Sequence, residues 1–187
     1  MQKLIITIII LSSAICNAQF LDTNYTLDTD KSIIKWKGSY SFNFGEHPGI
    51  VQFEKGTLKT QNNMITGGEF TIDMTTIAND PDIDHESPIE HLRDEDFFHV
   101  SKFPKAVLKI TDVIYIKEKN LHEVTADLTI KGITKSQKFY ATASGENNTF
   151  KTKFKIDRTR WGIIYNHKLK DQAISDAIEF DVLLTFK

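Results

Sequence analysis

Cysteine is almost absent from this sequence, since its 187 residues include only Cys16. A single cysteine excludes an internal disulfide and a zinc site built from several thiolates. An excess of either charge is also missing, because 23 Lys and Arg residues stand against 25 Asp and Glu residues, for a formal net charge of −2. This balance excludes a strongly basic nucleic-acid binder and a polybasic membrane anchor. We therefore expect no nucleic-acid partner.

The common catalytic and metal-binding signatures are missing as well. The sequence contains no G-x-S-x-G, P-loop, G-x-G-x-x-G or H-E-x-x-H motif. The closest grouping of histidines is His85, His91 and His99, and no two histidines form an H-x-H or i,i+4 pair. The acidic stretch 80–84 has the aspartate spacing of a calcium loop, but His85 stands where an EF-hand requires Gly. We expect no metal, no cofactor and no catalytic residue.

Long hydrophobic runs are scarce, and the one near the start has the layout of a secretory signal peptide. Lys3 supplies a positive start, residues 4–11 are almost wholly apolar, and Cys16-Asn17-Ala18 places small residues before a cleavage site. Crossing a bilayer takes about 20 apolar residues, and the rest of the chain has no such run. We expect cleavage after Ala18, a soluble mature protein and no stable membrane insertion.

Cys16 allows a second interpretation of residues 1–18, because a lipoprotein signal also places a cysteine after an apolar run. Ile15 precedes it, however, at a position where a lipoprotein normally has a small residue. An exported chain without disulfides is more typical of a bacterial periplasm than of a eukaryotic extracellular space. We expect a periplasmic or secreted bacterial protein with one domain over residues 19–187, and lipidation at Cys16 is the alternative.

The rest of the sequence favours strands. Apolar and polar residues alternate with a period of two in several runs, which predicts strands with one buried face. These runs cover residues 51–54, 69–74, 105–110, 124–131, 150–156 and 178–186. Turn-forming residues separate many of them, and the short gaps predict antiparallel hairpins. We expect an all-β chain folded as a single antiparallel barrel of about eight strands, because closure leaves no exposed sheet edge.

One stretch interrupts the strand pattern. Ser87, Pro88 and Glu90 have the arrangement of a capping box with proline at the first helical position. Apolar residues then follow among charges, up to Phe97 and Phe98. We expect one or two short helices over residues 87–100 that cover one mouth of the barrel as a lid. The alternative is that their side chains plug that end permanently.

Several short motifs occur in order along the chain. HLRDEDFF at 91–98 is followed by KFPKA at 102–106, and the others are WKG at 36–38, the pattern of His47, Gly49 and Phe53, FTIDM at 70–74, LTIKGIT at 128–134, and Asp157-Arg158 with Trp161-Gly162. Together they resemble the YceI-like family of bacterial polyisoprenoid-binding proteins. The resemblance covers roughly residues 25–187, and the loops at 80–86 and 166–172 depart from the pattern.

The resemblance implies a lipocalin-like barrel whose elongated apolar lumen holds a polyisoprenoid or a similar long-chain amphiphile, such as an isoprenoid quinone. The residues alone leave open whether the aromatic side chains line an open lumen or fill a core, since a barrel of this size is just wide enough for either. With a lumen, we expect ligand contacts at Trp36, His47, Phe53, Phe70, Met74, Leu92, Phe97, Phe98, Leu108, Leu128, Phe154, Arg158, Trp161 and Phe180.

His47 and Arg158 are the candidates to meet a polar head group, because the matched motifs place them beside apolar strand ends. The alternative for Arg158 is an internal salt bridge with Asp157 or Asp176. We expect a lipid-binding protein, not an enzyme. Two other functions stay open at this point: an isomerase or hydrolase with a carboxylate–His pair in the same cavity, and a ligand-free structural or stress-response module. Monomer and homodimer are also both open.

The predicted signal peptide gives the first testable prediction. The exported protein is expected to begin at Gln19, because the small residues before the cleavage site end at Ala18. The intact mass of the protein recovered from the exporting host checks the cleavage position. A mass that retains Cys16 with a diacylglyceryl group would contradict the prediction and attach the protein to a membrane.

Overall fold

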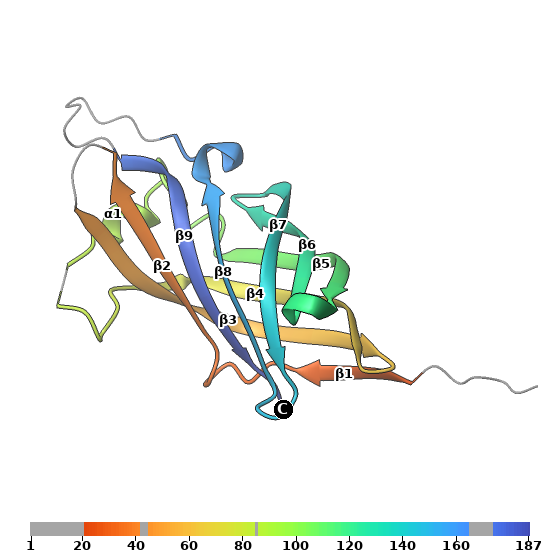
Figure 1. Ribbon diagram of the computed structural model, residues 1–187. Helices are drawn as coiled ribbons and strands as arrows, with labels where there is room; N and C mark the ends of the chain where they lie inside the picture. Colours follow the sequence, from red (N-terminus) through yellow and green to blue (C-terminus); the bar gives the residue numbers. More distant parts are fainter. Residues whose placement is uncertain (1–20, 42–44, 85, 165–173) are drawn as a thin grey trace, which may run out of the picture.

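The computed structural model describes residues 21–41, 45–84, 86–164 and 174–187, so the predicted signal peptide and Cys16 lie outside the described residues. None of the described helices is long and apolar enough to cross a membrane. The elements of the described part are shown in Figure 1. They are β1 (Asp22–Thr26), β2 (Ile33–Tyr40), β3 (Glu46–Gln61), β4 (Met64–Ala78), α1 (Ile89–Arg93), β5 (Lys105–Ile116), η1 (Lys117–Lys119), β6 (Leu121–Ile130), β7 (Ile133–Ser144), β8 (Thr149–Asp157), η2 (Arg158–Trp161) and β9 (Ile174–Thr185).

The strands form one antiparallel sheet that closes on itself. Its order is β1-β3-β2-β9-β8-β7-β6-β5-β4, and the pairing of β4 with β3 completes a ring of eight strands. Strand β1 stands outside the ring and pairs with the end of β3, from Asp22↔Gln61 to Thr26↔Thr57. The predicted all-β antiparallel barrel of about eight strands is therefore confirmed, with β1 as an additional outer strand.

Strand β3 makes the closure geometrically feasible. It is 16 residues long, and it pairs with β2 near its start, with β1 near its end and with β4 along most of its length. The β3–β4 register shifts at three places, the first between Ile50 and Gln52. Because a bulge bends a strand and increases its twist, these shifts let a long strand curve around the barrel.

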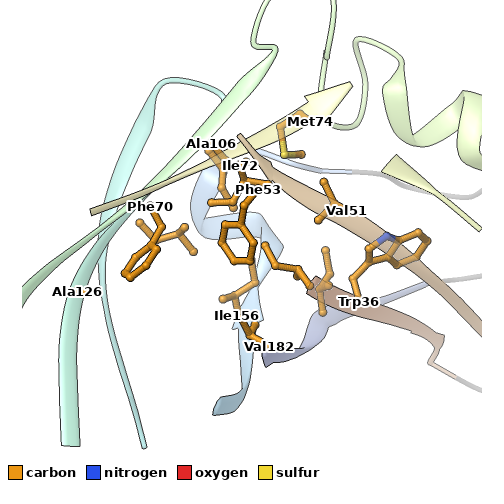
Figure 2. Packing of buried hydrophobic residues seen from close by; sticks show 14 of the residues in the cluster. Trp36, Val51, Phe53, Phe70, Ile72, Met74, Ala106, Ala126, Ile156 and Val182 are labelled. Carbon is orange, nitrogen blue, oxygen red and sulfur yellow. The ribbon is translucent and has the colours of Figure 1, made fainter. Parts of the chain in front are cut away.

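Alternation along the strands places apolar side chains inside the ring. In β6, Val124, Ala126, Leu128 and Ile130 are buried, whereas the residues between them are partly exposed. Figure 2 shows side chains from several strands, Phe53 among them, converging on a common interior. The period-two pattern of the sequence thus becomes one continuous apolar surface on the inner side of the barrel.

One neighbouring pair in the ring is joined over only part of its length. Strands β7 and β8 pair at four positions, from Ala141↔Thr152 to Ser144↔Thr149. By contrast, β8 pairs with β9 at nine positions, from Thr149↔Thr185 to Asp157↔Ala177. In Figure 1, β7 and β8 meet at their hairpin and diverge away from it.

The helical insertion is shorter than predicted, and its expected capping box is wrong. Helix α1 covers only Ile89–Arg93, has Pro88 as its N-cap residue and has no side-chain cap hydrogen bond. The Ser87 hydroxyl donates instead to the carbonyl oxygen of Pro48 (2.6 Å). The Glu90 carboxylate accepts from Arg93 (3.3 Å). Ser87 does not cap the helix because its hydroxyl is already used by a neighbouring strand.

The segment 87–103 is firmly attached to the barrel. The Arg93 guanidinium donates to the carbonyl oxygens of Thr75 (3.2 Å) and Ile77 (2.8 Å) at the end of β4. The Phe97 side chain is 4% exposed and lies edge-on to Phe98, with ring centroids 5.0 Å apart. Lids come from the weakly held parts of a structure, so these contacts favour a permanent plug over the lid that we expected.

Phe97 therefore provides a stability test. Phe97→Ala is expected to lower the free energy of unfolding by about 3–5 kcal/mol, as for other truncated core phenylalanines. Denaturant unfolding of the variant measures this loss. The control is Ile83→Ala, because Ile83 is 44% exposed and its truncation is expected to change stability by less than about 0.5 kcal/mol. A Phe97→Ala loss as small as that of the control would support the lid.

Candidate functional site: an apolar cavity inside the barrel

The barrel interior is not filled by its own side chains. It contains a cavity of about 420 Å³ that is lined by residues from β2 to β9 and from the segment 88–98. This volume falls in the range of about 300–1,000 Å³ that is usual for small-molecule pockets. A ligand-free structural module would have its lumen closed by Phe and Trp side chains. The described residues do not close the lumen in this way.

Aromatic rings form much of the cavity wall. Phe139 and Phe154 stack with centroids 4.7 Å apart and an interplanar angle of 17°, and Phe180 follows at 5.5 Å from Phe154. On the opposite strands, Phe53 lies edge-on to Phe70 at 6.3 Å. All five line the cavity, so the wall offers ring faces and edges to an apolar ligand.

Every predicted contact residue except Trp161 lines the cavity. Trp161 is fully buried (0% exposed), and its indole N–H donates to the carbonyl oxygen of Leu128 (3.0 Å). This buried hydrogen bond holds η2 against β6, and the indole ring packs within the barrel wall. The predicted contact residue Trp161 therefore lies outside the cavity lining.

Trp36 does lie on the cavity wall, at the centre of β2. Its indole N–H donates to the carbonyl oxygen of Ile50 on β3 (3.2 Å), and its ring packs directly over Gly49, its cross-strand partner. A Cβ atom at Gly49 would overlap the Trp36 ring. The glycine of the His47–Gly49–Phe53 pattern is thus needed for the close approach of the indole to the backbone.

Polar side chains gather at one end of the cavity. The Tyr40 hydroxyl and the His47 Nε2 are 2.8 Å apart, and the two rings meet edge-on with centroids 5.1 Å apart. Tyr40 ends β2 and His47 lies near the start of β3, so the β2–β3 pairing brings them together. Ser175, at the start of β9, lines the same end.

Arg158 reaches this end, but its guanidinium is held by the protein. The Nε donates to the carbonyl oxygen of Ser175 (3.1 Å), one terminal nitrogen to that of Ile163 (2.6 Å), and the other to the Asp176 carboxylate (2.9 Å). Its side chain is only 3% exposed. Burial lowers the pKa of Arg158 from its ordinary value, while the charges of Asp176 and Asp157 oppose that shift. The structure thus shows the internal salt bridge with Asp176.

Two groups of acidic residues in the described part of the chain were candidates for a metal site, the stretch 80–84 and the surroundings of His91. Asp80 lies 2.9 Å and Asp82 3.3 Å from the Lys35 ammonium, and the hydrogen bond from Lys35 lowers the pKa of Asp80. His91, Asp94 and Asp96 place ligand atoms within 4.8 Å of one another, but both aspartates are exposed. Exposed acidic groups of this kind occur commonly without a metal.

Some cavity residues were missed by the sequence analysis. Phe139 and Phe150 occupy inward positions of β7 and β8, and the period-two pattern was a sufficient signal to find Phe150. The period-two pattern could not identify Tyr40 and Ser175, because only the pairing of β2 with β3 and β9 brings them to the cavity.

Comparison with known proteins agrees with this architecture. The sequence model of the YceI-like domain matches residues 25–186, which is nearly the whole described barrel. The chain belongs to the YceI-like family. The resemblance proposed from the ordered motifs is therefore confirmed, and the ring of strands around an apolar cavity is a YceI-like barrel.

Individual relatives of this YceI-like chain are more distant. It is 32% identical over 77 residues to UPF0312 protein ECA1782 of Pectobacterium atrosepticum and, to the same extent, to Protein YceI of Salmonella arizonae; each match covers 41% of this chain and 39% of the relative. The chain thus matches about two fifths of their length. Among solved structures, Burkholderia cenocepacia BcnA is similar with a TM-score of 0.69 at 19% identity, covering 84% of this chain and 98% of BcnA, which shows the fold.

Arg158 provides a test of the electrostatic arrangement. Arg158→Lys is expected to lower the free energy of unfolding by about 1.5–3 kcal/mol, because an ammonium cannot reach all three acceptors of the guanidinium. Chemical denaturation gives the difference. The control is Lys109→Arg, the reverse exchange at an exposed position of β5, which is expected to change stability by less than about 0.5 kcal/mol. Equal losses in the two variants would contradict a structural role for the Arg158 charge.

Proposed function

We propose that this YceI-like protein binds and carries a long-chain isoprenoid or a similar amphiphile, with the tail inside the barrel. The observation that carries the proposal is the cavity of about 420 Å³ with a largely aliphatic and aromatic wall. Transfer of a tail from water is favourable by about 0.8 kcal/mol for each buried CH₂ group. Ten buried carbons contribute about 8 kcal/mol before the ordering cost of binding is subtracted.

The polar end of the cavity favours an uncharged head group. Among the described residues that line the cavity, none is Asp, Glu or Lys, and the one Arg is paired with Asp176. A phosphate or carboxylate would meet no unpaired cation on this part of the wall, and a buried ion without a partner is strongly unfavourable. The Tyr40–His47 pair offers hydrogen bonding to an alcohol or carbonyl head instead.

The same wall supports binding over catalysis. The rival enzyme requires a carboxylate–His pair inside the cavity. His91 lines the cavity and lies 3.9 Å from the Asp96 carboxylate, but Asp96 is exposed and is not among the described residues of the wall. With the export signal predicted from residues 1–18, we place the carrier in the periplasm or outside the cell. There, such a protein would shield an apolar tail from water.

A titration with two matched amphiphiles tests the function. Geranylgeraniol is expected to change tryptophan emission saturably, and geranylgeranyl phosphate, which has the same tail, is expected to bind at least about tenfold more weakly, because its charge has no counterion in the cavity. The signal is expected to persist in Trp161→Phe, which retains Trp36 on the wall, and to disappear in Trp36→Phe. Mass spectrometry of an organic extract of the purified protein identifies the native cargo.

The results separate the parts of the proposal. No saturable response to either compound, together with a lipid-free extract, would reject a lipid carrier. Equal or tighter binding of the phosphate would reject the uncharged head but keep the tail site. Folding of each variant is checked by circular dichroism, since Trp161 also holds η2 through its hydrogen bond to Leu128.

A further inference from the structure

The partial pairing of β7 with β8 leaves a break in the hydrogen-bonded wall. We call residues 136–140 of β7 and 153–157 of β8 the seam. Along the seam β7 keeps its ladder with β6 as far as Ile130↔Ile133, and β8 keeps its ladder with β9 as far as Asp157↔Ala177. The two strands are not paired with each other beyond Ala141↔Thr152. Figure 1 shows the resulting divergence of β7 from β8.

Side chains close the seam on its inner side. Phe139 projects from β7 and Phe154 from β8, and their rings stack across the break at 4.7 Å. Both rings line the cavity. At this part of the wall, therefore, the cavity is separated from the outside by two rings, and not by a strand ladder.

Hydrogen bonds of side chains also bridge the seam, beyond the stacked rings and away from the β7–β8 hairpin. The Gln137 amide donates to the carbonyl oxygen of Lys155 across the break (3.2 Å). The Arg160 guanidinium donates to the Gln137 side-chain oxygen (3.1 Å) and to the carbonyl oxygen of Ser136 (3.1 Å). These groups are mostly exposed, and exposed side chains change rotamer within nanoseconds. The seam can widen through such rotations without breaking a strand ladder.

The other end of the barrel is less suited to such motion. The segment 87–103 is held to β4 by the Arg93 hydrogen bonds, and its Phe97 is buried. The remaining strand pairs of the ring, from β8–β9 round to β6–β7, have longer ladders. Opening any of them would expose backbone groups, each of which loses a hydrogen bond with a net worth of about 1 kcal/mol.

We propose that the tail of the amphiphile enters and leaves the cavity sideways through the seam, as Phe139 and Phe154 move apart. This inference rests on the proposed function. A sideways path admits the whole length of a tail at once, whereas a path from one end requires the tail to be threaded. Gln137 and Arg160 act as a latch across the break, and the stacked rings act as the gate.

A cross-link across the seam tests the proposal in the full chain. In a Cys16→Ser background, Lys138→Cys and Lys155→Cys place two thiols on the outer faces of β7 and β8, and bismaleimidoethane joins them. The matched control joins Lys153→Cys to Asp181→Cys, a paired position of the β8–β9 ladder. Stopped-flow tryptophan emission follows the exchange of geranylgeraniol. The seam cross-link is expected to slow exchange at least tenfold, and the control cross-link to leave it within twofold.

A second variant tests the latch without a cross-link. Gln137→Ala removes both the amide bridge to Lys155 and the acceptor of Arg160, and Gln137 does not line the cavity. We expect exchange at least threefold faster with affinity changed less than twofold. The control is Gln61→Ala, which removes one surface hydrogen bond to Asp22 at the far end of β3 and is expected to leave exchange unchanged.

The outcomes distinguish this proposal from the function on which it rests. If the unmodified protein does not bind geranylgeraniol, the proposed function and the seam route both fail. If it binds but exchange is insensitive to the seam cross-link and to Gln137→Ala, the carrier function stands and the seam route is rejected. Equal slowing by both cross-links would likewise reject the seam, because the effect would then not be specific to β7 and β8.

Discussion

The pairing of β3 with β4 closes the sheet, and the other features of the molecule depend on that closure. With both edges of the ring joined, the inward faces of eight strands share one interior, and water reaches it only at the ends or at a break in the wall. The register shifts in β3 supply the curvature that this closure needs. Without the β3–β4 ladder, the same apolar side chains would line an open cleft.

Closure also explains why the polar groups of the interior are arranged as they are. The Arg158 side chain is buried, so its charge must be balanced by Asp176 and its donors satisfied by nearby carbonyl groups. The largely apolar wall of the cavity likewise makes an unpaired ligand charge unfavourable. The structural role of Arg158 and the proposed preference for an uncharged cargo thus have a common physical origin.

Local sequence rules failed where a distant partner competed for the same group. Ser87 matches a helix cap, but the carbonyl of Pro48 accepts its hydroxyl. Trp161 belongs to a ligand-binding family motif, but Leu128 accepts its indole N–H and removes the ring from the cavity. Both partners lie more than 30 residues away in the chain, so no local pattern contains the information that decides the outcome.

By itself, the sequence determined the strand class, the inward faces of strands such as β6 and the YceI-like family, because alternation and ordered motifs are local properties of the chain. Only the tertiary structure decided that Phe53 and Phe154 border a cavity instead of filling it, that Tyr40 meets His47, and that β7 diverges from β8. These features depend on the circumference of the ring and on the registers of distant strands. Whether a cavity remains depends on the summed volume of the inward side chains relative to the volume that a ring of this circumference encloses.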